Sequence, residues 1–305
     1  MSLPPDSVTI LITSANEPAT IGPALEALLS APPPSLVETL VVCPDEATAQ
    51  AAGHYSAQGV RVVRDPGLGK PAALNLGLSQ ARGEIVVLSD GDVRVDPRGW
   101  PRLLAPFSDP SVGAVTGRPV SVSPRGTPLG YWSHLLTEAG AHAIRLERDQ
   151  TGGFFLCSGY LYAFRKALAP RLPEDALAED AVISHHIWSQ GSRIRYVLEA
   201  RVYVRYPESY SDWVKQKQRS LAGYQQEYVR KYRVASRPHG GLRSFRSEFA
   251  FGALRSFQYA RNAREVIWTA LLFLARAHVW LSAFVLTRLT RRTHSQIWAR
   301  VDSTK

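Results

Sequence analysis

VVLSDGDVRVD, residues 86–96, is a run of β-forming residues that stops on two carboxylates, Asp90 and Asp92, with Gly91 between them. A two-residue hairpin would need alternating strands on both sides of the turn, and Pro97 interrupts the second one. The stretch therefore predicts a buried strand that delivers a pair of carboxylates to its carboxyl end.

An EF-hand calcium loop is the other ordinary interpretation of this stretch. It needs oxygen ligands at positions 1, 3 and 5 and a glycine at position 6, but Arg94 stands at the fifth position and Val95 at the sixth. What remains is a tight turn whose two carboxylates, Asp90 and Asp92, can share a hard divalent cation. Mg²⁺ or Mn²⁺, held by few carboxylates and completed by substrate phosphates, is typical of nucleotide sites.

Strand-like and helical patterns alternate outward from this point. We predict strands at 8–14, 39–44, 60–65 and 84–90, and helices at 21–30, 46–57 and 70–81. Such alternation indicates βαβ units, so the expected fold is α/β, with a mostly parallel, Rossmann-like sheet flanked by helices.

Polar clusters follow each predicted strand, at Thr13–Glu17, Asp45, Asp65–Lys70 and Asp90–Asp92. Asp and Asn favour turns, which would explain any one cluster alone. In open α/β sheets, however, ligands bind outside the carboxyl ends of the strands. The convergence of all four clusters on one edge therefore favours a binding site.

Composition sets the broad class. The chain has 305 residues, 45% hydrophobic and 20% charged, which suits one large domain or two modest ones. The first residues show no secretory pattern, and the two cysteines, Cys43 and Cys157, are far apart without metal-type spacing. These features predict a protein of a reducing cytoplasm.

The formal net charge of +10 is unevenly distributed. Residues 1–232 carry 23 Lys and Arg against 23 Asp and Glu, whereas residues 233–305 carry 13 against 3. We expect a balanced domain over 1–232, followed by a basic helical tail over 233–305. No nucleic-acid partner is expected, because the excess charge is confined to that tail.

Residues 8–220 resemble family 2 glycosyltransferases with the GT-A fold. Six motifs lie in that family's order: VTILITSANEPATIG, GLGKPAALNLGL, SDGDV, FFLCSGYLYAFRKAL, LAEDAVIS and PESYSDWVKQKQRS. The resemblance implies transfer of a sugar from a UDP- or GDP-type nucleotide diphosphate donor to an acceptor hydroxyl, with inversion at the anomeric carbon. It also implies a donor half over about 1–120 and an acceptor half over about 121–232.

The resemblance also implies roles for individual residues. Asp92, with Asp90, would hold Mg²⁺ or Mn²⁺, whose Lewis acidity stabilises the leaving diphosphate. The donor would be bound by Thr13, Glu17, Asp45, Lys70, Asp90 and Arg219. The acceptor side would comprise Cys157, Ser158, Gly159, Glu179 and Gln216.

An inverting displacement needs a base on the acceptor side, and Asp180 is the candidate. The alternative is that Glu179 and Asp180 only favour the start of a helix over 178–190 through its dipole. The segment around Asp45, where the family recognises the nucleobase of the donor, departs from the family pattern. Ser220 stands where the family has Trp, which argues against processive polymerisation of the sugar. His185 and His186 are adjacent on the helix and are expected to be structural.

Residues 265–292 contain enough apolar positions to span a bilayer, but Arg276 and His278 lie near the middle, and an Arg there costs about 2.5 to 3.5 kcal/mol. We favour one or two helices lying in the interface of an anionic membrane, with Trp268 and Trp280 at headgroup depth. A spanning helix and a packed soluble helix remain alternatives. The expected location is the cytoplasmic face of the membrane.

A second amphipathic helix is expected at 127–148, explained equally by core packing. Together these features predict a membrane-associated, metal-dependent inverting glycosyltransferase acting on a lipid-linked or glycan acceptor. A nucleotidyltransferase on a related fold, or an inactive GT-A scaffold binding anionic lipid or nucleic acid, are the alternatives.

Overall fold

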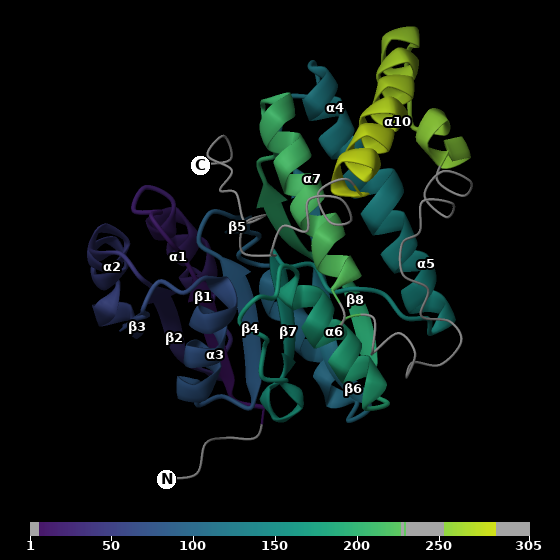
Figure 1. Ribbon diagram of the computed structural model, residues 1–305. Coiled ribbons are helices and arrows are strands. Elements are labelled where there is room, and N and C mark those ends of the chain that lie inside the picture. Colours follow the sequence, from purple (N-terminus) through teal and green to yellow (C-terminus); the bar gives the residue numbers. More distant parts are fainter. Residues whose placement is uncertain (1–5, 227–228, 230–252, 285–305) are drawn as a thin grey trace.

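The computed structural model describes residues 6–226, 229 and 253–284 of the chain (Figure 1). Its eight-stranded sheet has the order β3-β2-β1-β4-β7-β6-β8-β5. The strands are β1 Val8–Thr13, β2 Leu36–Cys43, β3 Val60–Arg64, β4 Ile85–Asp90, β5 Arg94–Val95, β6 Val112–Ser121, β7 Leu161–Arg165 and β8 Arg193–Val204.

Helices connect the strands and flank the sheet. They are α1 Ile21–Leu29, α2 Glu46–Gly53, α3 Lys70–Gln80, α4 Pro128–Leu135, α5 Ala143–Thr151, α6 Glu179–Ser189, α7 Tyr210–Gln225 and α10 Ala263–Phe284. Shorter turns of 3-10 helix occupy Ser56–Gln58, Trp100–Ser108 and Lys166–Leu168. The predicted elements of the first ninety residues are all present, with ends that differ by a few residues.

The mostly parallel α/β sheet is confirmed. Strands β3, β2, β1 and β4 run parallel as neighbours, and β6 runs parallel to β8. Strand β7 is antiparallel to both β4 and β6, and β5 is antiparallel to β8. In the parallel register Thr13 is the partner of Asp90, so the ends of β1 and β4 lie side by side.

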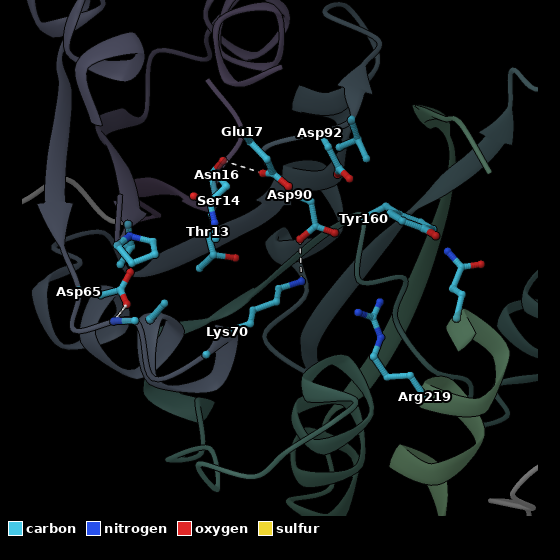
Figure 2. Close-up of a pocket in the computed structure, with 18 of the residues that line it drawn as sticks. Thr13, Ser14, Asn16, Glu17, Asp65, Lys70, Asp90, Asp92, Tyr160 and Arg219 are labelled. Atoms are coloured by element: carbon cyan, nitrogen blue, oxygen red, sulfur yellow. Dashed lines mark hydrogen bonds and ion pairs between the residues drawn. The ribbon is translucent and has the colours of Figure 1, made fainter. Parts of the chain in front are cut away.

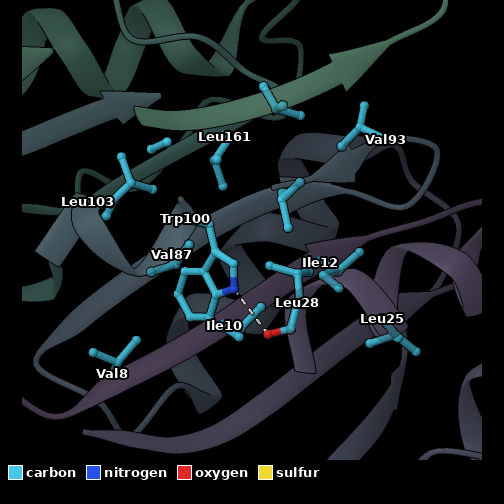
Figure 3. Close-up of a cluster of buried hydrophobic side chains, with 14 of the residues drawn as sticks. Val8, Ile10, Ile12, Leu25, Leu28, Val87, Val93, Trp100, Leu103 and Leu161 are labelled. Atoms are coloured by element: carbon cyan, nitrogen blue, oxygen red, sulfur yellow. Dashed lines mark hydrogen bonds between the residues drawn. The ribbon is translucent and has the colours of Figure 1, made fainter. Parts of the chain in front are cut away.

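Alternate side chains of the central strands fill two hydrophobic layers, one on each face of the sheet. Ile10 and Ile12 of β1 point to the layer that contains Trp100, whose Nε1 donates a hydrogen bond of 3.1 Å to the carbonyl of Leu28 (Figure 3). Leu11 points to the opposite layer. With β1 buried on both faces, its end is a rigid platform for polar residues.

The helix expected at 127–148 is in fact a longer helical stretch that changes pitch. Thr127 caps α4 by accepting from the N–H of Gly130, and a π-helical segment, Leu136–His142, separates α4 from α5. Tyr131 and Trp132 of α4 are buried, which agrees with the core-packing explanation.

Helix α10 packs against α4 and α7 rather than standing free (Figure 1). Among the described residues it is the one helix long and apolar enough to cross a membrane by length and composition. Trp268 and Trp280 are half-buried and pack against the apolar cluster that α10 forms with α4 and α7. Their expected position at headgroup depth stays a prediction. The basic residues that follow the apolar segment lie outside the described part of the chain; they are Arg288, Arg291 and Arg292.

Candidate active site

A cavity of about 440 Å³ opens at the carboxyl ends of β1 and β4. Residues from three of the four polar clusters line it, and Figure 2 shows them converging. The lining residues are Thr13, Ser14, Ala15, Asn16, Glu17, Val42, Pro44, Asp65, Gly67, Gly69, Lys70, Ala73, Asp90, Asp92, Val93, Tyr160, Val204, Arg205, Gln216 and Arg219.

The turn that carries Asp90 and Asp92 is pressed against the end of β1. A Cβ at Gly91 would lie 2.4 Å from Oγ of Ser14 and 2.9 Å from Oε2 of Glu17. The Ser14 hydroxyl in turn donates to Glu17 Oε2 at 2.6 Å. Gly91 is therefore required by close approach, and both carboxylates of the turn reach the same cavity.

Lys70 links the two halves of the site. It is the first residue of α3, directly after Gly69, whose φ of 101° favours glycine. Its Nζ lies 2.6 Å from Oδ1 of Asp90 and 2.6 Å from Oε1 of Glu179. A single ammonium thus contacts two carboxylates, one at the end of β4 and one at the start of α6.

The electrostatics follow from burial and from this shared ammonium. Burial disfavours the charged form of Lys70, but Asp90 and Glu179 outweigh it and raise the lysine pKa. Burial raises the pKa of Asp90 despite Lys70. Burial also acts to raise the pKa of Glu179, yet Lys70 lowers it overall. Lys70 and Glu179 therefore form a charged pair.

Asp180, the candidate base, lies beside Gly159 and outside the set of residues that line the cavity. A Cβ at Gly159 would lie 3.5 Å from its Oδ2. Burial, followed by the negative charge of Glu179, raises the pKa of Asp180 to about 6. A carboxylate with a pKa in this range is suited to accept a proton near neutral pH.

Cys157 and Ser158 are buried behind the site and do not line the cavity. The Cys157 N–H donates to Ser184 Oγ at 3.0 Å, and the Ser158 N–H donates to Thr116 Oγ1 at 2.8 Å. Burial raises the pKa of the Cys157 thiol to about 12, which makes it unreactive. In this structure the two residues anchor the segment that presents Gly159 and Tyr160.

Helix α7 supplies the opposite wall of the cavity. Gln216 and Arg219, one turn apart on α7, both line it, together with Tyr160 and Arg205. Oε1 of Gln216 is buried without a hydrogen-bond partner in the described part of the chain. The sequence analysis missed Tyr160 and Arg205. Arg205 directly follows β8, so the rule of strand ends would have found it if that strand had been predicted.

Asp45 and Asp65 follow neighbouring strands and differ in position. Asp45 caps α2 by accepting from the Thr48 N–H at 2.9 Å, and its other oxygen accepts from the Asn16 N–H at 2.6 Å. Burial opposes ionisation, but these hydrogen bonds outweigh it and lower the pKa of Asp45. Asp65 lines the cavity and Asp45 does not, although Asp45 fixes the loop that carries Asn16.

The carboxylate oxygens of the cavity suit a hard cation whose remaining ligands come from the substrate. Within the described ranges, no group of three or more His, Cys, Asp or Glu side chains is arranged to hold a metal by itself. Asp90 and Asp92 offer oxygen ligands in the same cavity as Lys70 and Arg219. One or two carboxylates are what Mg²⁺ typically takes from the protein when substrate phosphates supply the remaining ligands.

The two adjacent histidines behave as structural residues. His185 is buried, its ring centroid lies 4.5 Å from that of Phe154, and burial lowers its pKa to about 4. It has no carboxylate or thiol arranged with it for a metal among the described residues.

A mostly parallel sheet that ends in paired carboxylates, with a lysine and an arginine facing them, fits the GT-A type of α/β fold, in which the ligand site lies at the carboxyl ends of the strands. Residues 4–223 match the model of glycosyltransferase-like family 2. The chain belongs to that family.

Curated relatives carry the same family character. The chain is 24% identical over 231 residues to a probable glycosyltransferase, YdaM, of Bacillus subtilis, covering 72% of this chain and 55% of the relative. It is 27% identical over 168 residues to poly-β-1,6-N-acetyl-D-glucosamine synthase of Staphylococcus aureus, covering 54% of this chain and 40% of the relative. The chain thus spans about half the length of the curated relatives that it matches.

Solved structures share the fold. The mannosyltransferase PcManGT of Pyrobaculum calidifontis, in complex with GDP-Man and Mn²⁺, has a TM-score of 0.57 at 21% identity, covering 95% of this chain and 83% of the other. Residues 1–349 of S. aureus TarS have a TM-score of 0.51 at 16% identity, covering 85% and 76%.

Proposed function

We propose that the protein transfers a sugar from a nucleotide diphosphate donor to an acceptor hydroxyl, by a metal-assisted single displacement that inverts the anomeric carbon. The observation that carries the proposal is the convergence of Asp90, Asp92, Lys70 and Arg219 on one cavity in a family 2 chain. The related structures hold GDP-Man in PcManGT and UDP in TarS, which supports a UDP- or GDP-type donor.

The donor diphosphate would meet a cavity with charged groups of both signs. The guanidinium of Arg219 gives charge-assisted hydrogen bonds to phosphate oxygens, and Lys70 holds Asp90 in place beside them. Asp92 with Asp90 would hold Mg²⁺ or Mn²⁺, which supplies Lewis-acid stabilisation of the leaving diphosphate when bound. The nucleoside of the donor would lie against Thr13, Glu17 and Asp65. Asp45 holds the adjacent loop through the N–H of Asn16.

The acceptor would approach from the side of α6 and α7. Asp180 is the proposed base that takes the proton from the acceptor hydroxyl, and its raised pKa of about 6 supports this role. Glu179, paired with Lys70, adds the negative charge that helps to raise it. Gln216 and the segment around Gly159 would position the acceptor.

The proposed acceptor is lipid-linked or a glycan, used at the cytoplasmic face of an anionic membrane. The basic charge of residues 233–305 and the apolar helix α10 support membrane association. The polysaccharide product in the name of the S. aureus relative supports a glycan or its lipid-linked precursor.

A panel of nucleotide sugars, screened by thermal shift and by hydrolysis with and without Mn²⁺, tests the proposal. We expect one donor to stabilise the protein only with the metal, and Asp92→Asn to abolish that response. Asp109→Asn, which changes a partly exposed carboxylate that does not line the cavity, should leave it unchanged. Full sugar transfer by both Asp92→Asn and Asp180→Asn, or release of pyrophosphate instead of a nucleoside diphosphate, would contradict the assignment.

A further inference from the structure

Helix α10 has one face committed to the protein. Its buried positions are Glu265, Thr269, Leu272, Ala275 and Val279. These recur every three or four residues, so they form one side of the helix. This side completes an apolar cluster with Tyr131 and Trp132 of α4 and with Trp213 of α7.

The opposite face of α10 is apolar and exposed. Ile267, Leu271, Leu274 and Leu281 have exposed fractions of 60%, 44%, 67% and 65%. Their spacing of four, three and seven residues places them in a single row, which we name the apolar stripe. Large aliphatic side chains this exposed, gathered on one helix face, indicate an interaction surface.

The free-energy cost of placing Arg276 in a membrane does not apply to the apolar stripe. Arg276 follows Ile267 by nine residues, which at 100° per residue puts it on the other side of the helix. His278 does fall within the sector of the stripe, but its Nδ1 is hydrogen-bonded to the hydroxyl of Tyr210 at 2.9 Å. The stripe is therefore free of Arg and Lys over the described length.

Polar contacts hold α10 to the protein over most of its length. At one end Arg125 grips both carboxylate oxygens of Glu265 at 2.9 and 3.0 Å. In the next turn the carbonyl of Trp268 accepts from Trp132 Nε1 at 2.7 Å, and far along the helix Gln218 Nε2 donates to Ser282 Oγ at 2.8 Å. A helix docked in this way cannot cross a bilayer without carrying α4 and α7 with it.

Exposed cations surround the start of the stripe. Arg261 and Arg264 are exposed, whereas the neighbouring Glu265 is buried in its ion pair with Arg125. This charge is complementary to anionic lipid headgroups.

We propose that α10 is a monotopic membrane helix: it stays docked on α4 and α7 and lies along the surface of an anionic bilayer with the apolar stripe at the acyl boundary. The inference rests on the membrane association in the proposed function. It adds which face of α10 meets the bilayer and how deeply that face is buried. Burying one face of an amphipathic helix while its other face remains on protein is the geometry of interfacial anchors.

Vesicle cosedimentation of the full chain, without donor or metal, tests the inference separately from sugar transfer. The probes are phosphatidylcholine vesicles with and without phosphatidylglycerol. We expect binding to the anionic vesicles, weakened by about tenfold or more in a variant with Leu274→Glu and Leu281→Glu. Val122→Glu, which changes a 52% exposed aliphatic residue elsewhere, is the matched control and should bind as the parent does.

Three outcomes would overturn the inference. The first is equal binding by the parent and the double variant, and the second is absence of binding by the parent. The third is a concentration-dependent dimer in analytical ultracentrifugation that the double variant disrupts while vesicles do not bind, which would assign the stripe to a second copy. Because the variants change exposed residues, near-equal thermal unfolding of all three proteins is expected and keeps the comparison valid.

Discussion

The ammonium of Lys70 lies 2.6 Å from the carboxylate of Glu179, although the two residues are more than a hundred positions apart in the chain. The same ammonium also contacts Asp90. This contact joins the start of α3 to the start of α6, so one cation ties the proposed donor half to the proposed acceptor half.

Replacing Lys70 with Met should destabilise the protein by about 3 kcal/mol, because it leaves the largely buried Asp90 and Glu179 without their partner. Donor affinity should fall as well. Urea denaturation measures the first effect and donor titration the second. Lys215→Met breaks an exposed pair with Asp212 and should cost less than about 1 kcal/mol. Equal stability of the two variants would show that the Lys70 contacts do not stabilise the fold.

The rate of sugar transfer should rise with pH through about 6, because Asp180 must be ionised to accept a proton. Asp180→Asn should lower kcat/KM by about a hundredfold or more and remove this acid limb. The pH profile of kcat/KM is the measurement. An unchanged acid limb in a variant that keeps activity would assign the titration to another group.

Asp180 should also affect stability in a direction set by its raised pKa. Its pKa in the folded protein, about 6, is above the ordinary value of 3.8. The stability that the protonated carboxyl contributes is therefore full below pH 3.8 and is lost as the pH rises through about 6. Asp180→Asn should therefore be more stable than the parent at neutral pH, with the difference vanishing in acid. Denaturation at several pH values checks this, and a less stable variant at neutral pH would contradict it.

Gly91→Ala should cost about 1 to 3 kcal/mol, since the new Cβ would lie 2.4 Å from Ser14 Oγ and 2.7 Å from Ser14 Cβ. The displaced turn should also weaken metal-dependent donor binding. Gly53→Ala is the control, because a Cβ there meets nothing within 4 Å and Ala favours the helix by up to about 1 kcal/mol. Thermal unfolding of both variants decides, and parent-like stability of Gly91→Ala would refute the close-approach argument.

Arg125→Met should loosen α10 from the body of the protein, because it leaves Glu265, only 7% exposed, as an unpaired carboxylate at a cost of about 3 kcal/mol. Hydrogen exchange of the α10 amides should accelerate, with little change in the central strands. Arg255→Met, which breaks the exposed pair with Glu147, should leave exchange unchanged. Equal protection of α10 in both variants would mean that the apolar cluster alone holds the helix.

Local pattern was sufficient to predict the donor half of the fold. The alternation of short apolar runs with helical spacing predicts β1 to β4 and the helices between them, because buried parallel strands must be apolar on both faces. The rule that ligands bind at strand ends then predicts that Thr13, Lys70 and Asp90 meet.

Only the tertiary structure decided which residues face the cavity and which support it. Cys157 and Ser158 belong to a family-like motif, yet their backbone hydrogen bonds and burial place them behind the site. Tyr160 lines the cavity without a local signal that marks it, and Arg205 lines it at the end of β8, a strand that was not predicted. Whether a residue lines the cavity depends on the direction in which its side chain points in the packed fold. Spacing along the chain does not determine that direction.

The amphipathic tail shows the same division. The sequence by itself predicts that residues 265–292 contain a helix able to meet a membrane, because length and apolar content are local properties. The structure describes this helix, α10, from Ala263 to Phe284. The sequence did not determine that Trp268 and Trp280 turn toward the protein while Leu274 and Leu281 turn away. That choice was made by α4 and α7, which bury one face of the helix and leave the other exposed.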